Sequence, residues 1–263
     1  MTVQQALATS GIDAREARLL LAEVAGFSQA SVVAFPEKEL PAKTEESFFN
    51  LVSRRRRGEP IAYLIGHKGF YGLELTVNAA VLIPRPETEL LVELTLEKKP
   101  SSVLDLGTGS GAVALAVKKN LSKARIVAVE ASAAALVVAK RNAVKLGLEV
   151  DFRHGRWFEP VAGEAFDVIV ANPPYVADGD PHLSELRYEP RSALVSGTDG
   201  LDAVREIIPR ASGHLTPGGW LLLEHGMGQD GKVRALLSAA GLESVQSWPD
   251  LAGIPRVSGG KVE

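Results

Sequence analysis

The chain has 263 residues, of which 46% are hydrophobic and 23% charged, so it can bury a large core and is not expected to be disordered. Its 29 basic and 32 acidic residues give a net charge of −3, which excludes a broad positive field for binding nucleic-acid phosphates. The absence of cysteine excludes disulfides, thiolate metal sites and cysteine nucleophiles.

Residues 1–65 are expected to form a small helical domain. Thr2 opens a capping box, Asp13 is placed to cap a helix over residues 14–25, and Thr44 starts another helix. The arginines at 54–57 at the end of that helix suggest nucleic acid. Cations in a last helical turn also satisfy its free carbonyls and complement its dipole, and this second interpretation is favoured.

Residues 66–83 show short apolar runs between glycines, which predicts a β-hairpin linking the helical domain to a second domain over residues 84–263. Pro84 then begins a segment, residues 84–89, that opens a helix with acidic side chains in its first turn. Its polar side chains, Arg85 and the glutamates after it, serve the helix start or reach a pocket. The sequence leaves both roles open.

Beyond residue 101, predicted strands alternate with predicted helices. Strands are expected over residues 103–106, 125–130, 150–153, 166–171, 220–225, 244–248 and 256–261, and helices over 112–121, 132–146, 201–211 and 232–240. This alternation predicts an α/β fold with a doubly wound, mostly parallel, seven-stranded Rossmann-like sheet. Ligands of such sheets bind outside the carboxyl ends of the strands, so polar residues there are candidates for function.

A glycine-rich turn follows the first of these strands and indicates a nucleotide-like ligand. It contains Gly107, Thr108, Gly109, Ser110 and Gly111. Glycines let the backbone approach a ligand closely, and the free N–H groups at the following helix start favour an anionic group. The G-x-G-x-G spacing differs from the G-x-G-x-x-G of dinucleotide-binding turns, which favours S-adenosylmethionine over NAD.

Two residues at neighbouring strand ends complete the candidate cofactor site. Glu130 ends the next strand, about 20 residues beyond Gly109, where an acid can accept hydrogen bonds from both ribose hydroxyls. Trp157 follows the third strand, and its ring either covers the adenine face or belongs to the core.

A rigid tetrapeptide follows the fourth strand: Asn172, Pro173, Pro174 and Tyr175. An amide nitrogen is a poor nucleophile because its lone pair is delocalised into the carbonyl. The Asn172 side-chain oxygen and the Pro173 carbonyl could each accept a hydrogen bond from one N–H of such an amide. These two bonds would aim the nitrogen at a methyl donor. The prolines stiffen this segment, and Tyr175 offers an apolar wall for a planar substrate. The residues predict methyl transfer to a planar, amide-type nitrogen.

Other signals are weak. The long loop over residues 176–200 is expected to shape the substrate entrance. The five histidines show no metal-ligand spacing, so no metal site is expected. Neither a secretory signal nor a membrane span is predicted, because the most apolar region, residues 126–139, is interrupted by Glu130 and is shorter than ~20 residues. A cytoplasmic protein is expected.

Several segments together resemble the protein-(glutamine-N(5)) methyltransferases that modify peptide chain release factors. They are residues 57–66, 83–89, 105–111, 172–175, 189–190, 222–226 and 250–253, spread over nearly the whole chain. The resemblance implies methyl transfer from S-adenosylmethionine to the glutamine side-chain amide in the Gly-Gly-Gln loop of class 1 release factors. It also implies that the helical domain helps to hold the release factor.

By position, the resemblance assigns the glycine-rich turn, Glu130, Trp157 and Asn172 to the cofactor. It assigns residues 172–175 to the glutamine. This chain departs from the family pattern at Arg156, where many relatives have aspartate, and at Glu130, where aspartate is frequent. An acid-to-adenine contact at position 156 is therefore in doubt.

Two other functions are compatible with parts of the sequence. A DNA or RNA amino-group methyltransferase could use the same tetrapeptide for adenine, but it would have to flip a base and grip phosphates. The net charge of −3 argues against that function and against stable nucleic-acid binding. A non-catalytic nucleotide-binding module would not need the acceptor residues. A monomer that acts on release factors without a membrane contact is expected.

Overall fold

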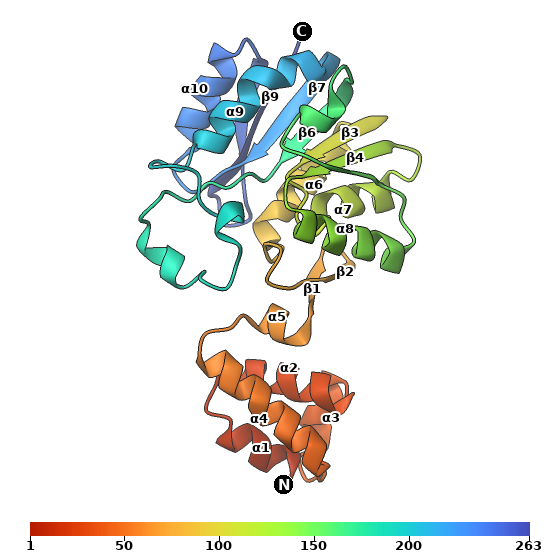
Figure 1. Ribbon diagram of the computed structural model, residues 1–263, viewed down its shortest axis with the longest axis vertical. Helices are drawn as coiled ribbons and strands as arrows, with labels where there is room; N and C mark the ends of the chain where they lie inside the picture. Colours follow the sequence, from red (N-terminus) through yellow and green to blue (C-terminus); the bar gives the residue numbers. More distant parts are fainter. The chain divides into compact units, whose positions relative to one another are not determined.

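The computed structural model describes residues 1–263 and divides into two compact units, Met1–His67 and Lys68–Glu263 (Figure 1). We describe each unit by itself. No helix in either is long and apolar enough to cross a lipid bilayer.

The smaller unit is helical. Its helices are α1 (Val3–Thr9), α2 (Ala14–Ala25), α3 (Gln29–Ala34), α4 (Ala42–Arg56) and α5 (Ile61–Ile65). The capping box at Thr2 is confirmed, and the Asp13 carboxylate accepts the N–H groups of Arg15 and Glu16 at the start of α2. Helix α4 begins after Pro41 rather than at Thr44, because the fixed φ of proline suits a helix start without a side-chain cap.

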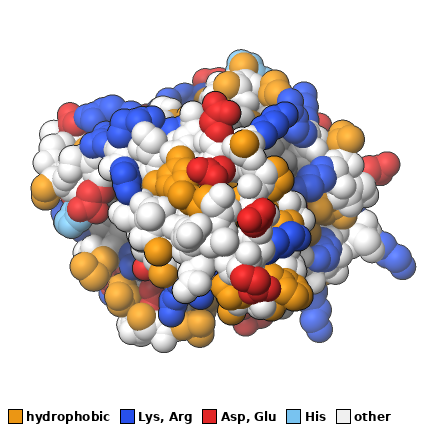
Figure 2. Space-filling view, turned by 90° about the horizontal axis from the view of Figure 1, so that it is seen from below, with side chains coloured by type: hydrophobic (Ala, Val, Ile, Leu, Met, Phe, Trp, Pro, Cys, Tyr) orange, Lys and Arg blue, Asp and Glu red, His pale blue; other side chains and the backbone are white.

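The arginines at the end of α4 bind groups within the small unit. Arg55 pairs with Glu16 through N–O distances of 2.7 and 2.8 Å, and Arg56 donates to the backbone carbonyl of Ser10. These contacts hold α4 against the segments around α1 and α2. The face shown in Figure 2 carries Asp and Glu side chains as well as Lys and Arg side chains. The structural interpretation of the arginine run is supported.

The predicted hairpin consists of β1 (His67–Phe70) and β2 (Leu73–Thr76). Its side chains Phe70, Leu73 and Leu75 are buried in the core of the larger unit. The Asn142 side chain fixes it further by accepting from the Thr76 N–H at 2.7 Å and donating to the Thr76 carbonyl at 3.0 Å. The hairpin is therefore packed into the core of the larger unit, while its first residue, His67, falls in the smaller unit.

The larger unit is built on a seven-stranded sheet, as predicted. Its strands are β3 (Ser102–Leu106), β4 (Arg125–Glu130), β5 (Asp151–His154), β6 (Phe166–Ala171), β7 (Leu215–Glu224), β8 (Glu243–Pro249) and β9 (Pro255–Lys261). Their order in the sheet is β5-β4-β3-β6-β7-β9-β8, and β9 runs in the direction opposite to the other six strands. The predicted α/β fold class is confirmed.

Strand β7 begins at Leu215, five residues before the predicted start. Its pairing with β6 shifts between Phe166 and Val168, which accommodates extra residues in β7. Proline and glycine in this stretch are typical of irregular strand positions, and they hide it from a sequence pattern.

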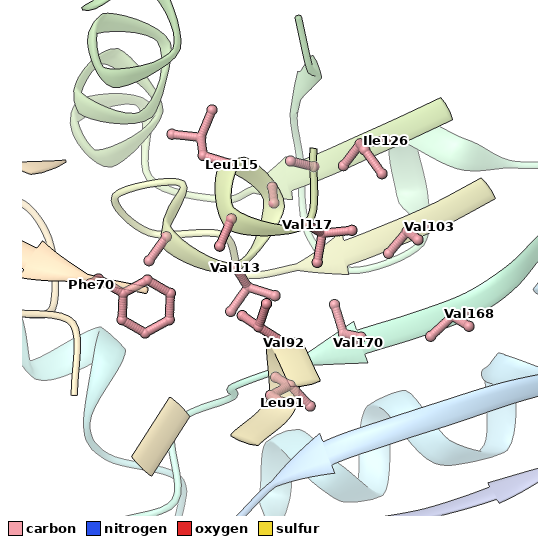
Figure 3. Packing of buried hydrophobic residues seen from close by; sticks show 14 of the residues in the cluster. Phe70, Leu91, Val92, Val103, Val113, Leu115, Val117, Ile126, Val168 and Val170 are labelled. Carbon is pink, nitrogen blue, oxygen red and sulfur yellow. The ribbon is translucent and has the colours of Figure 1, made fainter. Parts of the chain in front are cut away.

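Helices cover both faces of the sheet. Those in the larger unit are α6 (Glu89–Glu97), α7 (Ala112–Asn120), α8 (Ala133–Leu146), α9 (Asp202–Ala211) and α10 (Asp230–Ala239), with short 3₁₀ turns at Pro86–Thr88, Glu159–Val161, Pro181–Ser184, Arg191–Ala193 and Ser212–His214. Figure 3 shows Leu91 and Val92 of α6 near Val113 and Val117 of α7, in the cluster that also holds strand side chains.

Successive strand residues serve different cores. Val103 of β3 and Val168 of β6 lie in the cluster with α6 and α7, whereas Leu104 and Ile169 lie in the cluster with α9 and α10. Alternating side chains of a strand point to opposite faces of its sheet, so both faces bury apolar surface. This double burial holds the central strands rigidly, and functional residues follow them directly.

Candidate active site

A cavity of roughly 430 Å³ lies among the carboxyl ends of the central strands and the segments that follow them. Strands β3 and β6 are neighbours, and Leu106 pairs with Ala171 at their ends. Gly107 and Asn172 each come one residue later, and both line the cavity. Because adjacent strands are ~4.8 Å apart, the glycine-rich turn and the Asn-Pro-Pro-Tyr segment start side by side.

Most of the predicted site residues line this cavity. They are Gly107, Thr108, Gly109, Ser110, Glu130, Trp157, Asn172, Pro173 and Pro174. Gly111 and Tyr175 do not line it. Gly111 has a φ of 84° at the start of α7, and a Cβ there would meet Leu115 at 2.9 Å, so this glycine serves the helix start.

The side chain of Asp105 stabilises the glycine-rich turn by hydrogen bonds, and sequence reasoning did not select this residue. Its buried carboxylate accepts the Thr108 hydroxyl at 2.6 Å and the Ala114 N–H at 3.2 Å. Burial raises the pKa of Asp105 to about 6. Gly107 and Gly109 adopt φ values of 75° and 57°, which L side chains rarely tolerate. The turn therefore presents backbone atoms to the cavity.

Glu130 lies between the turn and the next loop. One carboxylate oxygen accepts the Gly109 N–H at 2.9 Å, and the other accepts the Ser132 N–H at 2.8 Å. Each carboxylate oxygen can accept a second hydrogen bond. Glu130 can thus brace the turn and still receive two hydroxyl groups of a ligand in the cavity.

Trp157 forms one wall of the cavity next to the glycine-rich turn. A Cβ on Gly107 would lie 3.4 Å from its ring, so the ring packs closely over the turn. Its indole N–H donates to Glu206 at 2.9 Å, and Arg156 pairs with the same carboxylate at 2.7 Å. The Arg156 bond holds the pKa of Glu206 below its usual value. Arg156 is therefore engaged with Glu206, beside the Trp157 ring.

Asn172 has one end of its amide engaged. Its Nδ2 donates to the Thr88 hydroxyl at 3.1 Å, which leaves Oδ1 as an available acceptor. Thr88 is buried at the junction of the 3₁₀ turn Pro86–Thr88 and α6, and it lines the cavity. No backbone N–H binds the Pro173 carbonyl. Two oxygens next to each other along the chain are thus available to a ligand.

The Tyr175 ring packs toward the end of β7 instead of lining the cavity. Its hydroxyl lies 3.4 Å from Oε1 of Glu224, and its carbonyl accepts the Gln229 side chain at 3.0 Å. Burial raises the pKa of Tyr175. The expected contact between Tyr175 and a planar substrate stays a prediction.

Glu224 is a second residue that sequence reasoning did not select. Its side chain is 1% exposed, and its Oε2 has no hydrogen-bond partner. Burial raises its pKa to about 7, while the Thr88 hydroxyl lowers that pKa by hydrogen bonding. The carboxyl lies beside the Tyr175 hydroxyl, at the end of β7.

The segment over residues 84–89 connects the cavity with the long loop over residues 176–200. Arg85 lines the cavity and forms an ion pair with Glu189, whose buried carboxylate also accepts the Ile83 N–H at 3.0 Å. Glu89 instead accepts the Tyr71 N–H at 2.8 Å in the hairpin. The sequence left open whether these polar side chains serve the helix start or reach a pocket. Arg85 reaches the cavity, whereas Glu89 binds the hairpin.

Comparison with known proteins identifies the class of protein. The family descriptions "Methyltransferase small domain" and "PrmC N-terminal domain" match residues 86–187 and 2–66. A methyltransferase from Pyrococcus furiosus superposes with a TM-score of 0.58 at 20% identity, over 81% of this chain and 98% of its own. A Thermus thermophilus 16S rRNA methyltransferase superposes with a TM-score of 0.55 at 23% identity, over 75% and 50%. Fold and site define a methyltransferase.

Two relatives of near-full length give the family. The release factor glutamine methyltransferase of Xylella fastidiosa strain Temecula1 is 48% identical over 97% of this chain and 96% of its own. That of Burkholderia pseudomallei is 46% identical over 99% and 96%. The chain belongs to the release factor glutamine methyltransferases, which confirms the resemblance noted from its sequence.

Proposed function

We propose that this enzyme transfers the methyl group of S-adenosylmethionine to the side-chain amide nitrogen of the glutamine in the Gly-Gly-Gln loop of class 1 release factors. One observation carries the proposal: Asn172, with its Oδ1 available, begins directly beside the glycine-rich turn at the paired ends of β3 and β6. A methyl donor on the turn and an amide on Asn172 would therefore be neighbours.

The charges of the cavity fit a cationic donor. Four carboxylates line it, from Asp105, Glu130, Asp202 and Glu206, against the two guanidiniums of Arg85 and Arg156. Both guanidiniums are paired with glutamates. A pyrophosphate would be repelled by this excess of negative charge, whereas a sulfonium and an ammonium group would be attracted. The cavity volume of roughly 430 Å³ is in the range of cofactor sites.

The chain's own residues would hold the donor in three ways. Glu130 would accept the ribose hydroxyls, and the Trp157 ring would cover the adenine. The backbone of the glycine-rich turn would approach the amino acid part closely, because Gly107 and Gly109 have no side chain there. Bound in this way, S-adenosylmethionine supplies an electrophilic methyl group.

Positioning would supply the rest of the catalysis. Oδ1 of Asn172 and the carbonyl of Pro173 would each accept one N–H of the glutamine amide, which fixes the nitrogen in its plane and in line with the methyl group. Pro173 and Pro174 restrict the backbone that carries these acceptors. The nitrogen can lose a proton after the methyl group has transferred, so no base is needed early.

We further propose that the enzyme acts on release factors in the cytoplasm, as a monomer and without stable nucleic-acid binding. The absence of cysteine is compatible with a reducing compartment, and the net charge of −3 is unsuited to phosphate backbones.

The test is a transfer assay with S-adenosylmethionine carrying a labelled methyl group. Purified release factor, its Gly-Gly-Gln-to-Gly-Gly-Ala variant, DNA and RNA would be offered separately. We expect label on the release factor and none on its variant. Label on nucleic acid, or equal label on the variant, would contradict the proposed substrate.

A further inference from the structure

The Trp157 wall of the cavity carries a carboxylate from a distant helix, that of Glu206 in α9. We propose that Glu206 is a specificity-determining residue, which accepts a hydrogen bond from the exocyclic amino group of adenine and so selects this base in the methyl donor. The inference rests on the proposed function, because it concerns the base of S-adenosylmethionine in the same cavity. It goes further by stating how the chain would distinguish adenine from a purine that carries an oxygen in place of the amino group.

The fold holds Glu206 at the cavity. Asp202, Ala203 and Glu206 of α9 all line it, because residues three or four apart lie on one face of a helix. The neighbouring side chains of Val204 and Ile207 are fully buried in the core that α9 shares with β3 and β6. The helix is therefore anchored by its apolar face, and Glu206 projects from a rigid support.

Two consecutive residues fix the Glu206 carboxylate. The Trp157 indole N–H donates to Oε2 at 2.9 Å, and Nη2 of Arg156 donates to the same oxygen at 2.7 Å. Oε1 accepts one bond, from Nη2 of Arg156 at 2.7 Å. A carboxylate oxygen can accept two hydrogen bonds, so Oε1 can accept one more. One acceptor at the edge of the wall is therefore available to a ligand.

The charge of Glu206 decides which group it can bind. The Arg156 bond holds the pKa of Glu206 below its usual value, so the carboxyl is ionised at neutral pH. An ionised carboxylate only accepts hydrogen bonds, and the Arg156 guanidinium only donates them. Because both Arg156 and Trp157 already donate to Glu206, the open position on Oε1 is complementary to a further donor and repels a carbonyl oxygen.

The place of the carboxylate relative to the ring indicates which part of the ligand it meets. Glu206 accepts from the indole N–H, so it lies at the rim of the Trp157 ring. A base stacked on that ring would turn an edge toward the rim. Adenine has an amino donor on its edge, whereas guanine-type purines have an oxygen acceptor there. The adenine edge therefore fits Oε1 of Glu206, and the edge of an oxygen-bearing purine does not.

The other carboxylates of the cavity are engaged elsewhere. Asp105 and Glu130 bind the glycine-rich turn. Asp202 pairs with Arg205 at 3.0 Å and makes no bond to the indole. Of the four cavity carboxylates, Glu206 is the one fixed to the ring that would cover the base.

Binding calorimetry with two ligands tests the inference. They are S-adenosylhomocysteine and S-inosylhomocysteine, the second of which carries an oxygen in place of the amino group. The wild-type enzyme is expected to bind the adenosyl compound at least about tenfold more tightly, the worth of a hydrogen bond to a charged group. In Glu206→Gln the amide can offer either its oxygen or its NH₂, so the preference should fall to about twofold. Equal binding of both ligands by the wild type would overturn the proposal.

The matched control is Asp202→Asn. It removes the same charge from the same helix and the same cavity, one turn earlier. Both affinities should change by a similar factor, so the preference for the adenosyl compound should stay near the wild-type value. A preference lost equally in Asp202→Asn and Glu206→Gln would show that the net charge is responsible, and the role of Glu206 would be refuted.

These measurements distinguish a failure of the inference from a failure of the proposed function. If the enzyme labels no release factor, but prefers the adenosyl compound and loses this preference in Glu206→Gln, the proposed substrate is wrong and the role of Glu206 stands. If it labels release factor from S-adenosylmethionine but binds both compounds equally, the proposed function stands and the role of Glu206 is wrong.

Discussion

The two halves of the cavity are built differently. In the cofactor half, backbone N–H groups of Gly109 and Ser132 satisfy Glu130, and the partners are at most 21 residues apart. In the acceptor half, side chains meet over 84 residues, from Asn172 to Thr88, and 49 residues, from Tyr175 to Glu224. The glycine-rich turn and Glu130 are thus fixed by short-range bonds. The Trp157 wall depends on the tertiary fold, as the acceptor half does, because its indole N–H reaches Glu206 over 49 residues.

The halves also differ in how well their buried groups are satisfied. Asp105 and Glu130 each accept two hydrogen bonds. Glu224 keeps one oxygen without a partner. Burial raises the pKa of Asp105 to about 6 and that of Glu224 to about 7, so each half contains a buried carboxyl that titrates near neutrality. The oxygen without a partner is what distinguishes the acceptor half.

The largest effect is expected from Asn172→Ala. Loss of Oδ1 should lower the methyl-transfer rate about 100-fold, because the glutamine amide is no longer aimed at the methyl group. Affinity for S-adenosylmethionine, measured by calorimetry, should stay within about twofold. The lost hydrogen bond is made to the glutamine amide and lowers the energy of the transition state. Equal losses of affinity and rate would show that the halves are not separate.

The second prediction concerns stability and pH. The pKa of Glu224 is raised from 4.5 to about 7 in the folded protein, so folding favours its protonated form. That contribution is present below pH 4.5 and is lost as pH rises through 7. Between pH 5 and pH 8, the unfolding free energy of the wild type should fall relative to Glu224→Gln by about 2 kcal/mol. These free energies would be measured by denaturant titration at each pH. A difference between wild type and Glu224→Gln that stays the same from pH 5 to pH 8 would contradict the raised pKa of Glu224.

The third prediction concerns the rigidity of the cofactor half. Gly111→Ala should destabilise the protein by about 1.5 kcal/mol, because φ is 84° and the new Cβ would approach Leu115. Gly231→Ala is the matched control, because this glycine lies in α10 with open space around it, and alanine should stabilise there by about 0.5 kcal/mol. Thermal unfolding that is equal for both variants would argue against a strained turn.

The smallest effect is expected at the adenine wall. Trp157→Ala should raise the Kd for S-adenosylmethionine about fivefold, the worth of one stacked ring, and Trp157→Phe should restore most of the affinity. Trp248→Phe, a change remote from the cavity lining, should leave the Kd unchanged. An unchanged Kd in Trp157→Ala would place the ring in the core alone.

Local signals in the sequence predicted the frame of the molecule well. The capping residues Thr2 and Asp13 and the apolar strand runs predicted most elements, because both patterns act over a few residues. The glycine-rich turn and the acceptor tetrapeptide also follow strands directly, so their meeting at one sheet edge could be predicted.

Other features depend on contacts between distant segments. Thr88 and Glu224 lie in an ordinary helix start and strand end, and no spacing rule connects them. The partnership of Arg85 with Glu189 spans 104 residues. Tyr175 is the last residue of the tetrapeptide, but its ring packs toward the end of β7, where its hydroxyl lies 3.4 Å from Oε1 of Glu224. Only the folded structure shows these arrangements.

The most direct measurement is a crystal structure with a non-reactive analogue of S-adenosylmethionine and a release-factor peptide that contains Gly-Gly-Gln. We predict that the glutamine Nε2 lies ~3 Å from Oδ1 of Asn172 and points at the donor position on the glycine-rich turn. A glutamine bound elsewhere, or an Asn172 amide with its Nδ2 toward the substrate, would contradict the proposed mechanism.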